Sequence, residues 1–485
     1  MKEQKGEITV FLVLVLGILI SMLFTGIEAA RINAVRFQSE CVADMALQSV
    51  LAEYNRELLE QYDLFFIESG YGTKQSGVIL LEEHIKDYMN QNFRNTVDYL
   101  PFGANPYNAK DLLELETKSV CVTKQIKAVD DGGEILEKAA IKYMLDKYGL
   151  PDTESIVNNR QEAEQNHIWE NKMNEKWAEN ERAIDDVDTT VTNDEGEEEE
   201  VPVHNPADAV NSKRGSSGIL RLVTRNAPIS YTEIQKSDFF SEREGSGLLN
   251  PTEGSSISAA EDLIFQKYLM EKCGMYTREK ENSLLSYQME YLLEGKSTDY
   301  DNLKAVVNKL IMLREVSNFM FLMSDNTKQA EAEALALTLS VVLMFPELKD
   351  LIKLSIIFAW SYAESVNDVA ILLDNGRVPL WKTNESWKLG LENALDLAIE
   401  TAETEEQNIT RGLSYTDYLH MFLTVMDKKE RNFRFMDLIE MDIRQTEGNR
   451  QFCIDKCIYG FTAEIITESK KGHSCILFRK ACYEK

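Results

Sequence analysis

The stretch ITVFLVLVLGILISMLFTGI, residues 8–27, contains no charged residue. As a helix with a rise of about 1.5 Å per residue, it is roughly 30 Å long, which matches the hydrocarbon thickness of a bilayer. The sequence therefore predicts a transmembrane helix over 8–27, with the lipid bilayer as its partner. The rest of the chain must then be placed relative to this segment.

The flanks of this run indicate its orientation. Lys2 and Lys5 make the short segment 1–7 basic, whereas Glu28 and Arg31 nearly cancel on the other side. Short Lys- and Arg-rich flanks stay cytoplasmic, so we expect a cytoplasmic N-terminus and an extracytoplasmic bulk. The run is longer than the apolar core of a cleaved secretory signal. A single-pass signal anchor in the cell membrane is therefore favoured.

A stalk helix is predicted over 28–66, continuing the membrane helix without a break. No Pro or Gly lies between Ile27 and Gly70. Apolar residues recur three and four positions apart, first as Ile27, Ala30, Ala34, Phe37 and Cys41. This stripe packs either on the protein's own globular part or on partner subunits. We expect both kinds of packing, with the membrane-proximal half of the stripe free to contact partner subunits.

Small residues mark positions where a second helix can approach closely. In lipid, helices associate through close contact and not through the hydrophobic effect. The predicted helix-packing interface consists of Gly17, Ser21, Gly26, Ala30, Ala34 and Phe37.

The whole chain is predicted to be α+β and helix-rich, with a few strands in its extracytoplasmic globular part. After the stalk we expect a first α+β region over 67–185, an acidic disordered linker over 186–217, a helical core domain over 218–448 and a C-terminal strand pair with a Cys cluster over 449–485. The linker is assigned by composition, because it holds like charges, Gly, Pro and Ser but almost no large apolar side chains.

Local patterns predict individual elements of these regions. Strands are expected at 113–126, 220–224 and 284–293 and as a pair within 453–482, core helices at 334–345 and 348–373, and one long helix over 416–444. Ser414 and Asp417 form a capping box ahead of that helix. Neither apolar core run reaches 18 uncharged residues, so no second membrane span is predicted.

Composition and motifs argue against several function classes. The net charge of −29 opposes nucleic acid as a partner, because phosphate binding needs clustered Lys and Arg. The sequence has no GxSxG, Walker A or HExxH motif, and we expect no catalytic site and no cofactor. Three tryptophans, Trp360, Trp381 and Trp387, lie close together in sequence, and core packing is favoured over a sugar-binding platform.

The only metal-like cluster lies near the C-terminus. It consists of Cys453, Cys457, His473, Cys475 and Cys482. A spacing of four between the first two residues is compatible with zinc, but the HxC pair is a poor match. Free or buried thiols, one or two disulfides, and a metal site remain alternatives, in that order of preference.

The opening stretch KGEITVFLVLVLGILISMLFTGIEAARINAVRFQSECVADMALQSVLAEYNRELLEQYDLFF, residues 5–66, resembles pseudopilin-like membrane proteins of Tad (Flp) pilus systems, the TadE/TadG-like group. The chain looks closest to a large uncharacterised Gram-positive family encoded in such systems. Further matching stretches are residues 313–315 with Asn318, GRVPLWKT at 376–383, and 413–444.

This resemblance implies a role in assembling or anchoring a surface pilus or a related secretion apparatus, with other pilin-like or pilus-assembly membrane subunits as partners. It also implies a processing site at Gly6 and Glu7, because prepilin-like chains are cut after a Gly that precedes the apolar run. Such chains carry a Glu five residues after the cut, where this chain has Phe11. An anchor or minor component is therefore expected instead of a major fibre subunit. The alternative is a membrane-anchored extracytoplasmic enzyme or binding module whose cleft lies in the 260–400 core.

Overall fold

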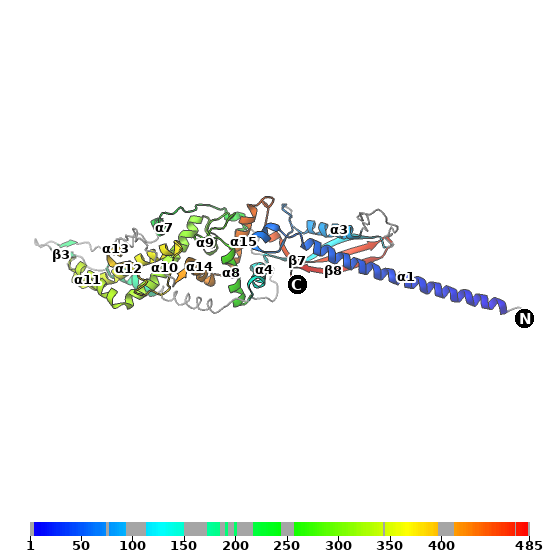
Figure 1. Ribbon diagram of the computed structural model, residues 1–485, viewed down its shortest axis with the longest axis horizontal. Coiled ribbons are helices and arrows are strands. Elements are labelled where there is room, and N and C mark those ends of the chain that lie inside the picture. Colours follow the sequence, from blue (N-terminus) through cyan, green and yellow to red (C-terminus); the bar gives the residue numbers. More distant parts are fainter. Residues whose placement is uncertain are drawn as a thin grey trace. The chain divides into compact units, whose positions relative to one another are not determined.

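The fold is α+β and helix-rich, as predicted, with one long apolar helix at the N-terminus and a small sheet (Figure 1). The computed structural model describes residues 4–73, 77–93, 113–149, 172–184, 190–192, 198–200, 217–243, 257–342, 345–395, 412–470 and 472–483. The chain divides into unit 1 (1–143, 247–255 and 443–485) and unit 2 (144–246 and 256–442). The positions of the units relative to one another are not determined, so each is described by itself.

Unit 1 combines helix α1 (Gln4–Leu51) with a four-stranded antiparallel sheet. The central strand β7 (Cys457–Ser469) pairs with β2 (Leu115–Lys127) along one edge, and with β8 (Ser474–Cys482) and the short β1 (Ile67–Glu68) along the other. The predicted strand at 113–126 and the predicted C-terminal strand pair are confirmed. The pair does not form a separate C-terminal region, however, because it completes the sheet of the N-terminal one.

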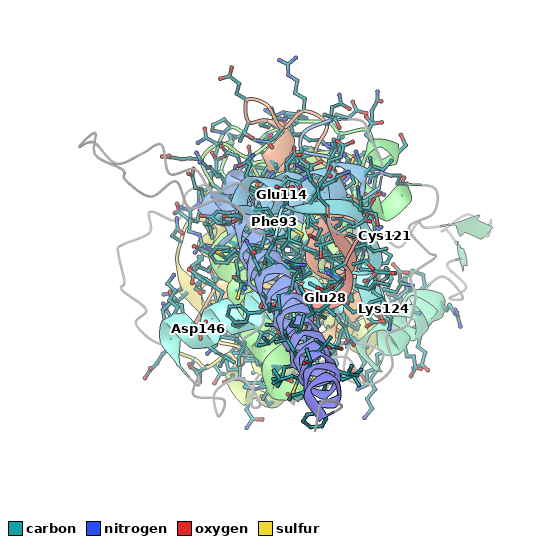
Figure 2. The ribbon with its side chains drawn as sticks, turned by 90° about the vertical axis from the view of Figure 1, so that its right-hand side faces the viewer. Glu28, Phe93, Glu114, Cys121, Lys124 and Asp146 are labelled. Atoms are coloured by element: carbon teal, nitrogen blue, oxygen red, sulfur yellow. The ribbon has the colours of Figure 1, made fainter. Side chains whose placement is uncertain are left out.

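One face of this sheet is covered by the second half of α1 and by α3 (Ile79–Phe93). Alternate residues of β7, namely Phe461, Ala463 and Ile465, point into this core, as a two-residue strand period requires. Cys121 and Lys124 of β2, labelled in Figure 2, are exposed. The sheet therefore has one apolar covered face, which is common in antiparallel sheets.

The predicted stalk helix over 28–66 is wrong in its second half. α1 ends at Leu51, and a separate helix α2 (Arg56–Tyr62) begins after Asn55, whose side chain accepts a hydrogen bond from the backbone N–H of Leu58 at 3.0 Å. Asp63 then ends α2 in the left-handed conformation, with φ at 54°. Asn and Asp compete with the helix for backbone hydrogen bonds, so they favour helix ends.

Unit 2 is mostly helical. Its helices are α7 (Ser217–Val223), α8 (Ala259–Lys272), α9 (Gln288–Glu294), α10 (Asp299–Ser324), α11 (Asn326–Val342), α12 (Lys349–Leu373), α13 (Leu391–Leu395) and α14 (Tyr415–Val425). The chain crosses between the units within α4 (Asp130–Tyr148) and α15 (Lys428–Arg444). A short ladder joins β5 (Arg377–Val378) to β6 (Leu413–Ser414). α12 packs against α10 and α11 and is the core helix of the unit.

Among the described residues, two helices are apolar and long enough to cross a membrane: α1, over Thr9–Leu51, and α12 with the residues just before it. α12 is buried inside unit 2, which confirms the predicted core helix at 348–373. The other predicted core helix, at 334–345, is a helix as far as Val342, as part of α11, but its assignment to the core is wrong. α11 leaves Leu337, Val341 and Val342 between 52% and 72% exposed and buries only small residues, Ala332, Ala336 and Ser340.

Three further element predictions for unit 2 are wrong. Residues 220–224 and 284–293 contribute to helices α7 and α9, not to strands, because short apolar runs lack a period that separates the two states. The single helix predicted over 416–444 is two helices. Met426 is extended, and Asp427 Oδ1 accepts the backbone N–H of Glu430 at 2.9 Å, which starts α15. The capping box of Ser414 and Asp417 is confirmed.

Of the predicted acidic linker over 186–217, the structure describes only seven residues. β3 (Thr190–Thr192) and β4 (Glu198–Glu200) pair antiparallel, and Ser217 begins α7. At these positions the chain has regular structure, which differs from the predicted disorder. The remainder of the linker lies outside the described residues.

Candidate functional site

The residues predicted to form a helix-packing interface on α1 are all exposed: Gly17, Ser21, Gly26, Ala30, Ala34 and Phe37. A Cβ atom built on Gly17 or Gly26 would meet nothing within 4 Å. The Phe37 side chain is 70% exposed, although it lies beyond the apolar run. This face of α1 is therefore open among the described residues.

Two opposite faces of α1 serve different purposes. Val35, Val42 and Ala46 are at most 3% exposed and pack on the sheet. At 3.6 residues per turn, about 100° per residue, Phe37 projects about 160° away from Val35 and Ala34 about 100° away from it, so both lie outside the buried face. The full exposed stripe recurs every three or four residues and consists of Ile27, Ala30, Ala34, Phe37, Cys41 and Met45. We call these six residues the open stripe.

Charged contacts hold the β7–β8 hairpin beside α1 from the point where the apolar run ends. Glu28, labelled in Figure 2, lies 3.2 Å from Arg31 Nη1 through Oε2 and 2.7 Å from His473 Nε2 through Oε1. Further along, Arg479 Nε of β8 lies 3.2 Å from Asp44 Oδ1. The end of the sheet therefore lies beside Glu28 of α1. Within unit 1, the apolar segment that precedes Glu28 extends past the end of the sheet (Figure 1).

The structure does not bring the five metal candidates together. Cys457 opens β7, while Cys475 and Cys482 lie at opposite ends of β8, roughly 23 Å apart at about 3.3 Å per residue. Zinc ligands lie within about 2.3 Å of one ion. His473 contacts Glu28 instead, and the seven cysteines, all of which lie in the described part of the chain, form no disulfide bond.

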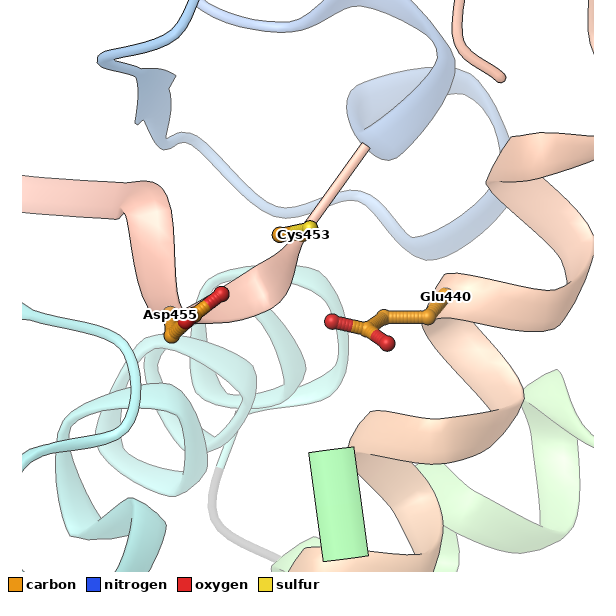
Figure 3. A group of neighbouring side chains, drawn as sticks. All are labelled: Glu440, Cys453 and Asp455. Atoms are coloured by element: carbon orange, nitrogen blue, oxygen red, sulfur yellow. The ribbon is translucent and has the colours of Figure 1, made fainter. Parts of the chain in front are cut away.

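Figure 3 shows three side chains of metal-binding types, Cys453 and Asp455 on the segment before β7, and Glu440 on α15. Cys453 belongs to unit 1, where its Sγ lies 3.7 Å from Arg444 Nη2. Glu440 belongs to unit 2, where its Oε2 lies 2.5 Å from Arg243 Nη2. Because the units are not placed relative to one another, we assign no site to the three residues.

A buried network of four charged side chains lies in unit 2. Lys382 Nζ is 2.5 Å from Glu364 Oε1 and 2.7 Å from Asp368 Oδ1, and Arg314 Nε is 3.1 Å from Asp368 Oδ2. Each side chain is at most 1% exposed. Two cations balance two carboxylates, as buried charges require. Burial raises the pKa of Glu364, and the neighbouring Lys382 acts in the opposite direction.

This charge network fixes the irregular segment 380–389 to α10 and α12. Arg314 Nη1 donates to the carbonyl of Leu380 at 2.8 Å. Glu364 accepts the backbone N–H groups of Lys388 and Leu389, at 3.0 and 2.9 Å. The segment is thereby held in one conformation by groups that have no access to water.

Sequence reasoning missed the charge network as a structural unit. Arg314 and Lys382 lie in two of the stretches that carry the resemblance, 313–315 and 376–383. Their carboxylate partners lie on α12, and the Arg314–Asp368 pair is separated by 54 residues in sequence. No local spacing in the sequence can predict a pair this far apart. The only sequence feature that indicates a buried ion pair is the presence of charged residues inside strongly apolar runs.

Comparison with known proteins gives one match. The model of a family of unknown function (DUF5702) matches residues 196–469, which is more than half of the chain, so the chain belongs to this family. The matched range includes the charge network and excludes α1. No curated protein and no solved structure matches the chain.

Proposed function

We propose that this member of the DUF5702 family is a membrane-anchored structural or assembly component, minor and pseudopilin-like, of a Tad (Flp)-type pilus or a related secretion apparatus. The observation that supports it best is the open stripe of α1. The stripe starts in an apolar segment long enough to cross a bilayer. It continues along the part of α1 whose other face packs on the sheet. A helix with such a stripe can pack on other helices both in lipid and just outside it.

In this proposal, residues 8–27 form a single-pass anchor. The N-terminus lies in the cytoplasm, because Lys2 and Lys5 are on that side, and both units are extracytoplasmic. The pilus assignment itself comes from the resemblance of residues 5–66. Phe11, at the position where pilins carry Glu, favours a subunit that stays in the membrane, whether or not the chain is cut between Gly6 and Glu7. We propose no catalytic role.

Site-specific photocrosslinking in membranes tests the open stripe. The full chain carries benzophenone-alanine in place of Phe37, and the matched control carries it in place of Ile79, which is 62% exposed on α3. We expect an adduct from position 37 with a membrane subunit that has its own N-terminal apolar helix, identified by mass spectrometry. Equal adducts at both positions, or none at position 37, would contradict lateral packing through the stripe.

A second candidate function is an envelope binding module, and one observation favours it. Unit 2 is not a purely apolar core, because four charged side chains are buried at its centre next to a cavity. Such preorganised polar groups are typical of binding sites.

A further inference from the structure

The two long edges of the sheet in unit 1 differ in how their backbone groups are used, and side chains of α3 cover the edge that β2 forms. Asn90 Oδ1 accepts the backbone N–H of Thr117 at 3.0 Å. Glu82 Oε1 accepts the backbone N–H of Val122 at 2.7 Å. Three register shifts also interrupt the pairing of β2 with β7. Coverage by a helix and bulges both keep an edge strand from pairing with another chain.

β8 forms the opposite edge, and its hydrogen bonds show which of its backbone groups face away from β7. At the hairpin, the N–H of Ser469 donates to the carbonyl of His473 at 2.8 Å. At the far end, the N–H of Tyr483 donates to the carbonyl of Tyr459 at 3.3 Å. Hydrogen-bonded pairs alternate with non-bonded pairs along an antiparallel ladder. The odd-numbered residues of β8 therefore bond to β7, and the even-numbered residues direct their N–H and C=O groups to the outer edge.

This outer edge of β8 is open. We call its even-numbered residues Ser474, Ile476, Phe478 and Lys480 the edge row. Within the described part of the chain, their outward N–H and C=O groups have no hydrogen-bond partner, and β8 pairs with β7 alone. Their side chains lie on the face of the sheet that α1 and α3 leave uncovered, where Ile476 is 57% and Phe478 62% exposed. An exposed apolar edge without a bulge or a proline is a template for an added strand.

We propose that the edge of β8 binds an extended segment of a different protein as an added antiparallel strand. The outward backbone groups of the edge row pair with the backbone of that segment, which supplies affinity, and its alternate side chains supply specificity. An acidic residue lies opposite the exposed Lys480, and aliphatic residues lie opposite Phe478 and Ile476, because opposite charges and apolar pairs across strands are favourable. The partner sequence is therefore acidic-x-aliphatic-x-aliphatic.

A second copy of β8 does not fit this edge if α1 is the single-pass anchor of the proposed function, and this step alone rests on that function. β8 runs in the direction of α1, because His473 contacts Glu28 and the Tyr483 hydroxyl donates to the carbonyl of Leu51 at 2.6 Å. Two copies of β8 pair antiparallel only about an axis that also reverses α1, which one membrane does not allow. A two-fold axis along the strands would place the two edge rows on opposite faces, where neither covers the other.

Hydrogen exchange of the full chain in detergent, with and without a synthetic peptide, tests this site. The peptide has nine residues, with glutamate at the second position, valine at the fourth, isoleucine at the sixth and threonine elsewhere. In the antiparallel register its glutamate lies opposite Lys480. Without the peptide, we expect fast exchange of the outward amides of Ile476 and Phe478 and slow exchange of the inward amide of Leu477. Saturating peptide is expected to slow exchange at 476 and 478 by about tenfold or more and to leave Leu477 unchanged.

Methylated peptides separate strand addition from nonspecific apolar adhesion. N-methylation of the valine and the isoleucine removes N–H groups that face β8, and we expect it to abolish the protection. N-methylation of the third and fifth residues removes N–H groups that face away, and we expect it to preserve the protection. Equal results for the two methylated peptides would overturn the proposal, as would a lack of protection at 476 and 478 with the unmodified peptide.

Variants of the protein test the side chains. Phe478→Thr is expected to weaken peptide binding about threefold, followed at the amide of Ile476, because it removes one cross-strand apolar pair. The matched control is Ile79→Thr on α3, which removes an apolar side chain that is also 62% exposed and is expected to leave binding unchanged. An equal effect of the two variants would contradict the proposed register.

Two further outcomes identify the occupant and separate this proposal from the pilus role. Protection of the edge row that rises with protein concentration in the absence of peptide would assign the edge to a second copy and overturn the proposed partner. No effect of the peptide, together with a photocrosslink at position 37, would reject this edge and leave the pilus proposal intact. Protection by the peptide without that photocrosslink would support the edge and reject lateral packing through the open stripe.

Discussion

Lys382 is the cation that lies between two buried carboxylates of unit 2. Its Nζ lies within 2.7 Å of both Glu364 and Asp368, and its side chain is 1% exposed. Removing one partner of a buried ion pair leaves an uncompensated charge, which is far more costly than losing a surface pair. A substitution of Lys382 is therefore expected to destabilise unit 2 strongly.

We expect Lys382→Met to lower the free energy of unfolding of unit 2 by about 3–5 kcal/mol, because methionine keeps the bulk but leaves Glu364 without its cation and Asp368 with Arg314 alone. Denaturant unfolding followed by tryptophan fluorescence measures this, since all five tryptophans belong to unit 2. Lys353→Met is the control, and it breaks a solvent-exposed pair with Glu333, which contributes far less to stability than a buried pair. Similar losses for the two variants would show that the charge network contributes little.

Glu290 is a buried carboxyl group that titrates near neutral pH. It lies on α9, and its Oε1 accepts the hydroxyl of Tyr415 at 2.6 Å and the backbone N–H of Tyr276 at 2.9 Å. Burial raises its pKa to about 7 from the ordinary value of 4.5. Because the folded-state pKa is the higher one, Glu290 contributes stability that is fully present below about pH 4.5 and is lost as the pH rises through 7.

The loss between pH 4.5 and 8 is expected to be about 3 kcal/mol from this group, at about 1.4 kcal/mol per pKa unit. Glu290→Gln keeps the acceptor oxygen but cannot ionise. We therefore expect it to make unit 2 more stable than the wild type at pH 8 and to flatten the dependence of its unfolding midpoint on pH. Glu392→Gln, at an exposed position of α13, is the control. An unchanged pH profile in Glu290→Gln would mean that Glu290 is ionised in the folded protein throughout this range.

At the scale of elements, α1 packs on the sheet along one face and leaves the other open. Ala46 is 0% exposed against the sheet, whereas Ala34 belongs to the open stripe. The same substitution at the two positions therefore separates folding from association.

We expect Ala46→Leu to destabilise unit 1 by about 1–3 kcal/mol, because extra methyl and methylene groups overpack the core. Ala34→Leu should leave unit 1 unchanged and, if the stripe is an interface, reduce capture of the partner in the photocrosslinking assay. Hydrogen exchange of the β7 amides measures the first effect. Equal exchange in both variants would mean that the sheet does not constrain this face of the helix.

The elements also show which features a sequence can predict. α3, α10 and α12 and the strands β2, β7 and β8 follow from periodicity, because each has a polar side or clear end signals. The strand predicted at 284–293 proves to contain the helix α9 because Gln288–Leu293 is buried on all sides, so its sequence shows no helical period. Five of the six residues of the open stripe, all except Met45, follow from the helical spacing of apolar residues in the sequence. The face of α1 that the sheet covers is determined by β7, which lies more than 400 residues away in the sequence. No local sequence pattern contains that information.

At the scale of the whole molecule, the two ends of the chain build one unit. β7 joins β1, β2 and β8, so the N-terminal helix cannot bury Val42 and Ala46 until the C-terminal strand is present. Unit 2, by contrast, is built from residues that lie between 144 and 442, so it needs neither end of the chain. Contacts between α1 and β7 require the ends of a very long stretch of chain to meet, so they are expected to form later in folding than local contacts.

A chain that ends at Arg450 therefore tests the division into units. It lacks β7 and β8, and we expect the amides of β2 to exchange about as fast as those of an unfolded segment, because their ladder partner is gone. Tryptophan fluorescence and its denaturation midpoint should stay close to those of the full chain, since the charge network and α12 are intact. Protected β2 amides in the shortened chain would show that α1 and α3 hold this strand without the C-terminal pair. Loss of the tryptophan transition would show instead that unit 2 depends on unit 1.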